Sequence, residues 1–314
     1  MSYLLDIVLP THNRAALLVR TLDSLGRLTV PMGVQVHLYV VGNACTDDTP
    51  DVVARFATAA PFTVTYLEEP TAGKSYALNC GIRAGRGEWI AFFDDDEAIC
   101  DNWIEVFERE RVALGFDFAG GFYLPEFEVP PPSWLPPRYA PTVISRHTEG
   151  TPRQQLDDRS ALMWGGNCAI RRAAFDQVGL YREELARHRE LRSLGCEDVE
   201  MQMRLVRAGF RGWFIPELQI RHWTPRERLT PSFFREKCYW AGHTNRRFER
   251  AYPEYTAPTA QMLGMPRWRL RAALGAVGGW LRSGITGARQ DQFDYELDLR
   301  WFLGYWRARL QEVR

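Results

Sequence analysis

Short apolar runs alternate with helical patterns along the first 125 residues. Strands are predicted for the runs at 4–9, 34–41, 62–67, 89–93 and 118–122. Helices are predicted near 13–25 and at 50–59, 76–83 and 102–114. Strands that alternate with helices favour a mostly parallel, twisted sheet covered by helices on both faces. Because ligands bind at the carboxyl ends of strands in such sheets, the loops after these runs are expected to share one crevice.

A proline-rich segment interrupts this pattern between residues 125 and 160. Its centre, residues 130–137, reads Pro-Pro-Pro-Ser-Trp-Leu-Pro-Pro, which excludes a helix or a central strand. The segment is either a passive linker or a binding loop, with Trp134 as a contact. Regular patterns return at 161–225, where strands are predicted at 162–170 and 213–215 and helices at 172–178 and 197–208.

The last region, 226–314, is expected to be a basic helical extension of a catalytic domain that covers 1–225. One helix begins near Trp268 and another carries Leu299, Phe302 and Trp306 on one face. Residues 226–289 hold twelve basic and four acidic side chains. Either these helices pack on the core with their arginines in solvent, or they present a basic amphipathic surface to an anionic membrane.

Composition narrows the class of protein. The 314 residues carry 39 basic and 39 acidic side chains, and this balance argues against a nucleic-acid binder. Six scattered cysteines without a Cys-x-x-Cys pair exclude a zinc ribbon and fit a reducing compartment. The sequence shows no signal-peptide pattern and no apolar run of membrane-spanning length. We therefore expect a cytoplasmic protein, either free or peripheral on the inner face of the membrane.

The strongest local signal is the acidic run Asp94-Asp95-Asp96-Glu97, which follows the apolar strand at 89–93. Neighbouring carboxylates repel one another unless a cation neutralises them. Carboxylate oxygens suit Mg²⁺ or Mn²⁺. The run is therefore either a divalent-metal site or a solvated acidic turn before the next helix.

Six motifs in order resemble those of family 2 glycosyltransferases, which are inverting enzymes with the GT-A fold. They span about residues 4–225: Pro10-Thr11-His12-Asn13-Arg14, the turn at 41–49, the helix at 73–82, the run Asp94-Asp95-Asp96, the segment Gly165-Gly166-Asn167 and the pair Glu197-Asp198. The resemblance implies a Rossmann-like sheet that binds a nucleotide-sugar donor together with Mn²⁺ or Mg²⁺.

The resemblance also assigns roles to residues. It implies that Asp96 binds the metal, with His222 as a further ligand, and that Asp198 is the general base. The nucleotide and donor contacts would be Pro10, Thr11, Asn13, Arg14, Asn43, Lys74, Asp94 and Asp95. The donor-sugar and acceptor contacts would be Trp164, Gly165, Gly166, Asn167 and Glu197. Structural explanations remain open for several of them: acids such as Glu197 and Asp198 are favoured in the first turn of any helix, and Trp164 could belong to the core.

One position departs from the family. Many members carry, in the second-strand turn, an aspartate that pairs with uracil, whereas this chain has Gly42 and Asn43. An asparagine amide can still hydrogen-bond a base edge. We expect a metal-dependent inverting glycosyltransferase that moves a sugar, from a UDP-sugar in the first instance, to a hydroxyl of a glycan, a lipid-linked acceptor or another acceptor. The alternatives are a sugar nucleotidyltransferase and a non-catalytic carbohydrate- or membrane-binding module of the same fold.

Overall fold

The computed structural model describes residues 3–135, 138–139, 150–158, 162–185, 195–255, 259–262 and 264–311. These residues divide into two compact units. The first unit comprises the described residues within 1–126, 148–189 and 196–223. The second comprises those within 127–147, 190–195 and 224–314. Residues 127–135 of the proline-rich segment therefore belong with the C-terminal helices.

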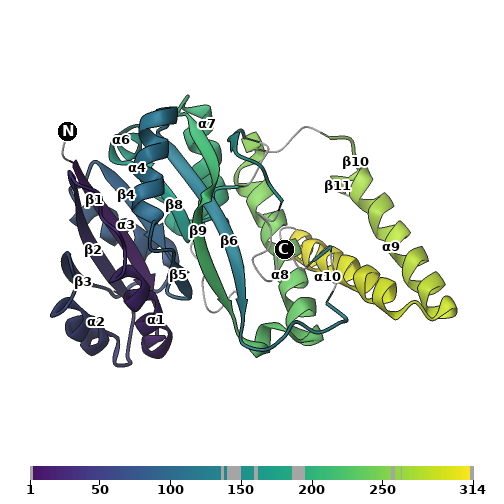
Figure 1. The fold of residues 1–314 in the computed structure, drawn as a ribbon. Coiled ribbons are helices and arrows are strands. Elements are labelled where there is room, and N and C mark those ends of the chain that lie inside the picture. Colours follow the sequence, from purple (N-terminus) through teal and green to yellow (C-terminus); the bar gives the residue numbers. More distant parts are fainter. Residues whose placement is uncertain are drawn as a thin grey trace. The chain divides into compact units, whose positions relative to one another are not determined.

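A mixed sheet forms the centre of the first unit (Figure 1). In the described residues its strands run in the order β3-β2-β1-β4-β8-β6-β9-β5, with β7 beside β9. The strands are β1 (Tyr3–Thr11), β2 (Val34–Asn43), β3 (Thr63–Glu69), β4 (Trp89–Phe93), β5 (Glu97–Ile99), β6 (Phe118–Phe127), β7 (Gln154–Gln155), β8 (Asn167–Arg171) and β9 (Gly212–Thr224). The first four pair in parallel, whereas β8 joins β4 and β6 antiparallel, and β5 joins β9 antiparallel.

Helices cover both faces of this sheet, which confirms the predicted α/β class. The helices α1 (Ala15–Leu25), α2 (Thr49–Ala57) and α4 (Trp103–Leu114) contribute to one apolar core. The helices α3 (Lys74–Ala84), α6 (Arg172–Val178) and α7 (Glu197–Arg207) contribute to the other. Strand β1 shows why two cores form: Leu5, Ile7 and Leu9 enter the first, and Val8 between them enters the second. The parallel strands thus end at one edge, where their loops meet.

The second unit is mainly helical. It contains α8 (Pro231–Ala251), α9 (Arg267–Thr286), α10 (Arg289–Gln311) and a short hairpin of β10 (Gln261–Met262) and β11 (Met265–Pro266). Helices α8 and α10 approach closely, because a Cβ on Gly242 would overlap the Trp301 carbonyl and one on Gly304 would overlap the Tyr239 carbonyl. None of the helices in the described ranges is long and apolar enough to cross a membrane.

Three elements differ from the sequence-based prediction. The prediction placed this strand at 213–215, whereas β9 runs for 13 residues and continues through Pro216. A proline argues against the interior of a strand, so the pattern alone favours a shorter one. Strand β5 begins at Glu97, the last residue of the acidic run, and its three residues are too few to show a periodicity. Helix α8, which has 21 residues, was not predicted. Much of the proline-rich segment, including 136–137 and 140–149, lies outside the described residues.

Candidate active site

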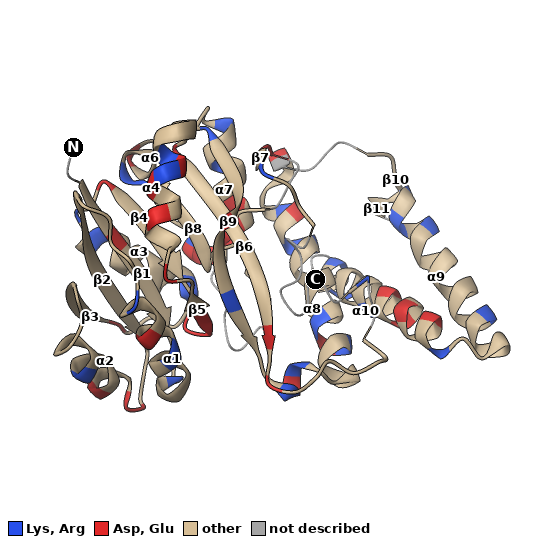
Figure 2. Cartoon of the chain, viewed as in Figure 1, with Lys and Arg blue, Asp and Glu red and all other residues tan. Residues whose placement is uncertain are grey.

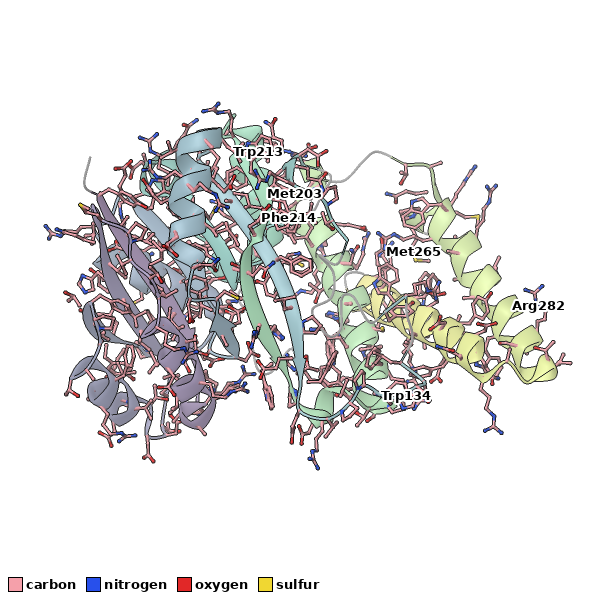
Figure 3. All side chains as sticks on the ribbon, viewed as in Figure 1. Trp134, Met203, Trp213, Phe214, Met265 and Arg282 are labelled. Atoms are coloured by element: carbon pink, nitrogen blue, oxygen red, sulfur yellow. The ribbon has the colours of Figure 1, made fainter. Side chains whose placement is uncertain are left out.

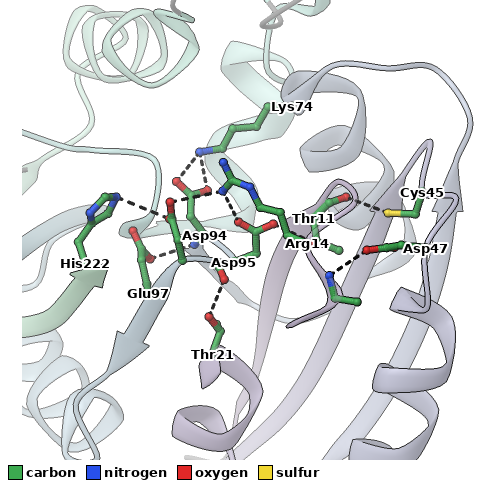
Figure 4. A network of polar contacts seen from close by, with 12 residues as sticks. Thr11, Arg14, Thr21, Cys45, Asp47, Lys74, Asp94, Asp95, Glu97 and His222 are labelled. Atoms are coloured by element: carbon green, nitrogen blue, oxygen red, sulfur yellow. Dashed lines mark hydrogen bonds and ion pairs between the residues drawn. The ribbon is translucent and has the colours of Figure 1, made fainter. Parts of the chain in front are cut away.

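The acidic run forms the turn between β4 and β5, and its four carboxylates separate into two groups. Asp95 points back to the β1–α1 loop, where its Oδ2 accepts a hydrogen bond from Thr11 Oγ1 at 2.8 Å and its Oδ1 from Arg14 Nη1 at 2.9 Å (Figure 4). Burial raises the pKa of Asp95, which Arg14 opposes and the charge of Asp96 reinforces. Asp95 thus anchors this loop to the end of β4.

The other three carboxylates form a potential cation site. Oxygens of Asp94, Asp96 and Glu97 all lie within 4.8 Å of one another. The Glu97 side chain is buried, its Oε2 accepts the Asp94 N–H at 2.9 Å, and its Oε1 has no hydrogen-bond partner among the described residues. Burial, and next the charge of Asp94, raise the pKa of Glu97 well above its usual range. This donor set fits a divalent cation, which would neutralise carboxylates that otherwise repel one another.

Strand pairing brings His222 to the same cluster. Strands β5 and β9 place Glu97 opposite His222, and the imidazole Nε2 lies 3.6 Å from Asp96 Oδ1. The adjacent Trp223 N–H donates to the Asp96 carbonyl at 2.8 Å, which fixes this register. The structure therefore positions His222 where it can add a nitrogen ligand to the carboxylate cluster.

Lys74 connects this cluster to the start of α7. Its Nζ lies 2.5 Å from Asp94 Oδ1 and 2.8 Å from Asp94 Oδ2. Burial lowers the pKa of Lys74, but the charges of Asp94 and Glu197 outweigh it and raise the value overall. Lys74 is thus a cation held among the acidic groups of the crevice.

Asp198 and Glu197 open helix α7 on the other side of Lys74. The half-buried Asp198 accepts the Gly165 N–H at its Oδ2 (3.2 Å) and the Val199 N–H at its Oδ1 (2.8 Å). Burial raises the pKa of Asp198 despite the opposing charge of Lys74. Burial, and next the charge of Asp198, raise the pKa of Glu197 to about 7. Both carboxyls therefore lie in an environment that favours the protonated form more than water does.

The double glycine separates Asp198 from the carboxylate cluster. A Cβ on Gly165 would lie 3.4 Å from Asp198 Cβ and 3.5 Å from Lys74 Nζ. A Cβ on Gly166 would overlap Glu97 Oε1 and lie 2.8 Å from Asp94 Oδ2. Both glycines therefore line the crevice, and Gly166 leaves room that the carboxylates occupy.

One residue next to the double glycine differs from the expectation. Asn167 is fully buried, and its side chain accepts from Trp103 Nε1 and donates to the Phe122 and Leu218 carbonyls, so it joins strands within the core rather than facing a sugar. Trp164 is partly buried against the first core. Tyr123, which the sequence did not single out, accepts the Gly166 N–H at its hydroxyl (3.1 Å).

The loops after β1 and β2 are tied to each other. Pro10 lies within β1 opposite Val41, and Asn13 Oδ1 accepts the Thr46 N–H at 2.7 Å. Asp47 caps α1, because its Oδ2 accepts the Ala15 N–H at 2.9 Å. The predicted donor-binding residues on these loops are therefore held in place by local hydrogen bonds.

The end of β2 offers different groups from those expected. The buried Asn43 donates both amide hydrogens, to the Glu69 and Thr71 carbonyls, and accepts the Gly73 N–H. Its amide therefore holds the β3–α3 loop. A Cβ on Gly42 would overlap the Tyr66 hydroxyl. Tyr66 from β3 thus fills the space at residue 42.

Trp134 belongs to the second unit. Its ring packs edge-on against Phe234 of α8 and Phe293 of α10, each with ring centroids 5.7 Å apart. Leu135 and Tyr139 join the same apolar cluster. The structure therefore gives Trp134 a partly buried position against the apolar cluster of the second unit.

Comparisons with known proteins agree with this architecture. A mannosyltransferase from Pyrobaculum calidifontis, solved with GDP-mannose and Mn²⁺, matches with a TM-score of 0.67 at 17% identity over 99% of this chain and 88% of that chain. The S. aureus TarS fragment 1–349 solved with UDP matches with a TM-score of 0.52 at 14% identity, over 98% of this chain and 91% of that chain. In sequence, the succinoglycan biosynthesis protein ExoM of Rhizobium meliloti is 24% identical over 77% of this chain and 74% of its own length.

The sheet order and these structural matches define the GT-A fold. The family model "Glycosyl transferase family 2" matches residues 6–179. The chain belongs to glycosyl transferase family 2.

Proposed function

We propose that the chain is a metal-dependent, inverting glycosyltransferase that uses a nucleoside-diphosphate sugar. The observation that carries this proposal is the meeting of two acidic groups in one crevice. Asp94, Asp96 and Glu97 gather at the carboxyl end of β4, and Asp198 lies beyond Gly165 and Gly166. One group suits a cation, and the other suits a proton acceptor.

Asp96, Glu97 and Asp94 would hold Mn²⁺ or Mg²⁺, with His222 as a nitrogen ligand. A bound divalent cation would neutralise the charge that grows on the leaving diphosphate. Lys74 and the half-exposed Arg14 present two further positive groups beside the same carboxylates. The mannosyltransferase that matches in structure was solved with Mn²⁺, which supports the assignment of a metal.

Asp198 would act as the general base. The acceptor hydroxyl oxygen forms a bond to the anomeric carbon, its proton passes to an Asp198 oxygen, and the diphosphate leaves with the electron pair of the broken bond. A single displacement of this kind inverts the anomeric configuration. The hydrogen bond from Gly165 N–H orients the carboxylate, and burial raises its pKa toward the range in which a base works well.

Nucleotide choice would depend on the end of β2. Asn43 uses both amide hydrogens on backbone carbonyls, whereas the Tyr66 hydroxyl occupies the space at Gly42 and can both donate and accept. We propose UDP as the first nucleotide to test and GDP as the second. Similar structures were solved with UDP and with GDP-mannose, so both belong in the test.

The acceptor would be a hydroxyl of a glycan or of a lipid-linked saccharide. The name of ExoM, a succinoglycan biosynthesis protein, supports a polysaccharide product. We include in the proposal a peripheral location at an anionic membrane, with contact through residues 226–289. The excess of arginine in that segment supports this part.

Product analysis tests the proposal. The purified chain is incubated with UDP-sugars and GDP-mannose, with Mn²⁺ or with EDTA, and the released phosphates are separated. A glycosyltransferase releases the nucleoside diphosphate only with metal, and NMR of the product shows the inverted anomer. Pyrophosphate consumption or release would instead indicate a nucleotidyltransferase. No turnover with any donor would indicate a binding module that has lost its chemistry.

A further inference from the structure

Helix α9 of the second unit exposes an unusual amount of apolar surface. Leu274 is 74% exposed and Ile285 is 88% exposed, and Val277 and Leu281 between them are also exposed. These four residues are spaced by three, four and four positions, so they form one stripe along the helix. Scattered surface leucines need no explanation, but a continuous stripe indicates an interaction surface.

The opposite face of α9 is already occupied. Its buried residues Arg269, Ala276 and Ser283 recur every seven positions. Arg269 forms an ion pair with Glu249 of α8, and its guanidinium lies 4.4 Å from the ring centroid of Tyr305 in α10. The exposed stripe therefore lies on the side of α9 opposite the residues that are buried against its own unit.

The charge on α9 has a single sign. The helix carries four arginines and no acidic residue, and Figure 2 shows blue without red along it. Arg271 lies three positions before Leu274, and Arg282 lies three positions before Ile285, so both extend from the side of the helix that carries the stripe. Both are exposed, and Figure 3 shows Arg282 directed outward.

This combination discriminates between two kinds of partner. In a symmetric contact between two copies of α9, the arginines of one copy would approach those of the other, which costs energy. An anionic lipid surface pairs with the same arginines through its headgroups and accepts the apolar stripe among its acyl chains. A helix that is too polar to span the bilayer can still lie in its interface.

We propose that α9 docks flat on an anionic phospholipid membrane, with Leu274, Val277, Leu281 and Ile285 inserted and Arg271 and Arg282 at the headgroups. This inference rests on the membrane contact of the proposed function, and it narrows that contact from the 226–289 segment to one face of one helix. Docking would hold the crevice of the enzyme at the surface where a lipid-linked acceptor resides.

The test is sedimentation of the full chain with two kinds of vesicle, phosphatidylcholine alone and phosphatidylcholine with one quarter phosphatidylglycerol. We expect binding to the anionic vesicles that weakens as salt is raised. Replacing Arg271 and Arg282 by alanine should lower the partition coefficient about fivefold for each arginine. The double change Leu274→Asp and Ile285→Asp should abolish binding. Val112→Asp, at a 70% exposed apolar position on α4, is the matched control and should bind as the wild type does.

Three results would overturn the inference: no binding to anionic vesicles, equal binding to both vesicle types, or unchanged binding by the Leu274→Asp/Ile285→Asp chain. Light scattering of the free protein tests the alternative that a second copy of the chain binds the apolar stripe. A dimer that this double change dissociates would make that second copy the partner. Failure of docking is distinguishable from failure of the proposed transfer. Asp96→Asn should bind vesicles normally but release no nucleoside diphosphate, and Leu274→Asp/Ile285→Asp should still turn over a water-soluble acceptor.

Discussion

Replacing Gly166 by alanine should weaken metal binding. A Cβ at this position would overlap Glu97 Oε1 and lie 2.8 Å from Asp94 Oδ2. The φ angle of Gly166 is not positive, so alanine adds no backbone strain there. The added methyl must therefore displace carboxylates that we assign to the metal.

The size of the effect follows from the cost of overpacking. Inserting a methyl into a filled space costs about 1–3 kcal/mol. If the added methyl destabilises the cation-bound arrangement of the carboxylates by this amount, Mn²⁺ affinity drops roughly 5- to 150-fold, since about 1.4 kcal/mol corresponds to tenfold. Disturbing the groups that orient metal ligands typically costs a similar 10- to 100-fold.

Gly165→Ala is the matched control, because its Cβ would meet neighbours at ordinary distances of 3.4 Å and more. Titration calorimetry with Mn²⁺ and UDP should show weak binding for Gly166→Ala and near-normal binding for Gly165→Ala. Adding Glu97→Asp to Gly166→Ala shortens the crowded carboxylate and should restore part of the affinity, a coupling that general destabilisation would not produce. Wild-type Mn²⁺ affinity in Gly166→Ala would refute the assignment of this cluster to the metal.

Four further predictions follow from the geometry. Asp198→Asn should lower turnover by about 10²–10⁴-fold while calorimetric donor binding is kept, and normal turnover would exclude Asp198 as the base. Tyr66→Phe should weaken nucleotide binding roughly 2- to 12-fold through loss of one hydrogen bond; unchanged binding would mean that Tyr66 only fills space. Asp47→Ala removes the acceptor of the Ala15 N–H at the start of α1 and of the Thr49 N–H and hydroxyl at the start of α2, and it should cost about 0.5–2 kcal/mol in urea unfolding, whereas no change would show that water replaces these bonds. The raised pKa of Glu197, about 7 against 4.5, means that the folded chain holds this proton more tightly. Its stabilising effect is therefore complete below about pH 4.5 and lost as pH rises to about 7, so Glu197→Gln should gain stability relative to wild type between pH 5 and pH 8, and a pH-independent difference would contradict the shift.

The sequence predicts the core of the fold because the physical signal there is local. The runs that became β1, β2 and β4 are mainly apolar and mostly buried, as parallel strands inside a sheet require, and each is followed by a helical pattern. The same logic locates much of the crevice. Since parallel strands end at one edge, Thr11, Lys74 and the acidic run were expected to lie close together. In the structure Thr11 bonds Asp95 and Lys74 bonds the adjacent Asp94.

The features that could not be predicted from the sequence depend on contacts between residues far apart in the chain. Helix α8 is rich in arginine and polar residues, and its burial of Phe234 and Cys238 becomes visible only when α10 packs against it. Trp134 illustrates the same limit, because its partner Phe293 lies far along the chain. Its position in a proline-rich segment left a passive linker and a binding loop as alternatives, whereas the structure shows a partly buried ring packed against an apolar cluster.

The roles of several site residues also depend on contacts that the sequence does not show. Asn167 was grouped with the sugar contacts because it follows a double glycine, but three core hydrogen bonds define its role. Asp95 could not be separated from Asp94 and Asp96 in a run of acids, and only the positions of Thr11 and Arg14 turn it away from the cluster. The pairing of β5 with β9 places Glu97 opposite His222. The sequence could not predict this pairing, because a three-residue strand has no recognisable pattern.

Calorimetric titration with UDP, GDP and dTDP, first with Mn²⁺ and then with EDTA, tests the central claim most directly. The account predicts that one of these nucleotides, UDP in the first instance, binds with Mn²⁺ and that EDTA abolishes this binding in the wild type. Asp96→Asn should show the same loss without EDTA. Binding that persists in EDTA would contradict the metal site, and no binding of any of the three nucleotides would contradict the proposed donor.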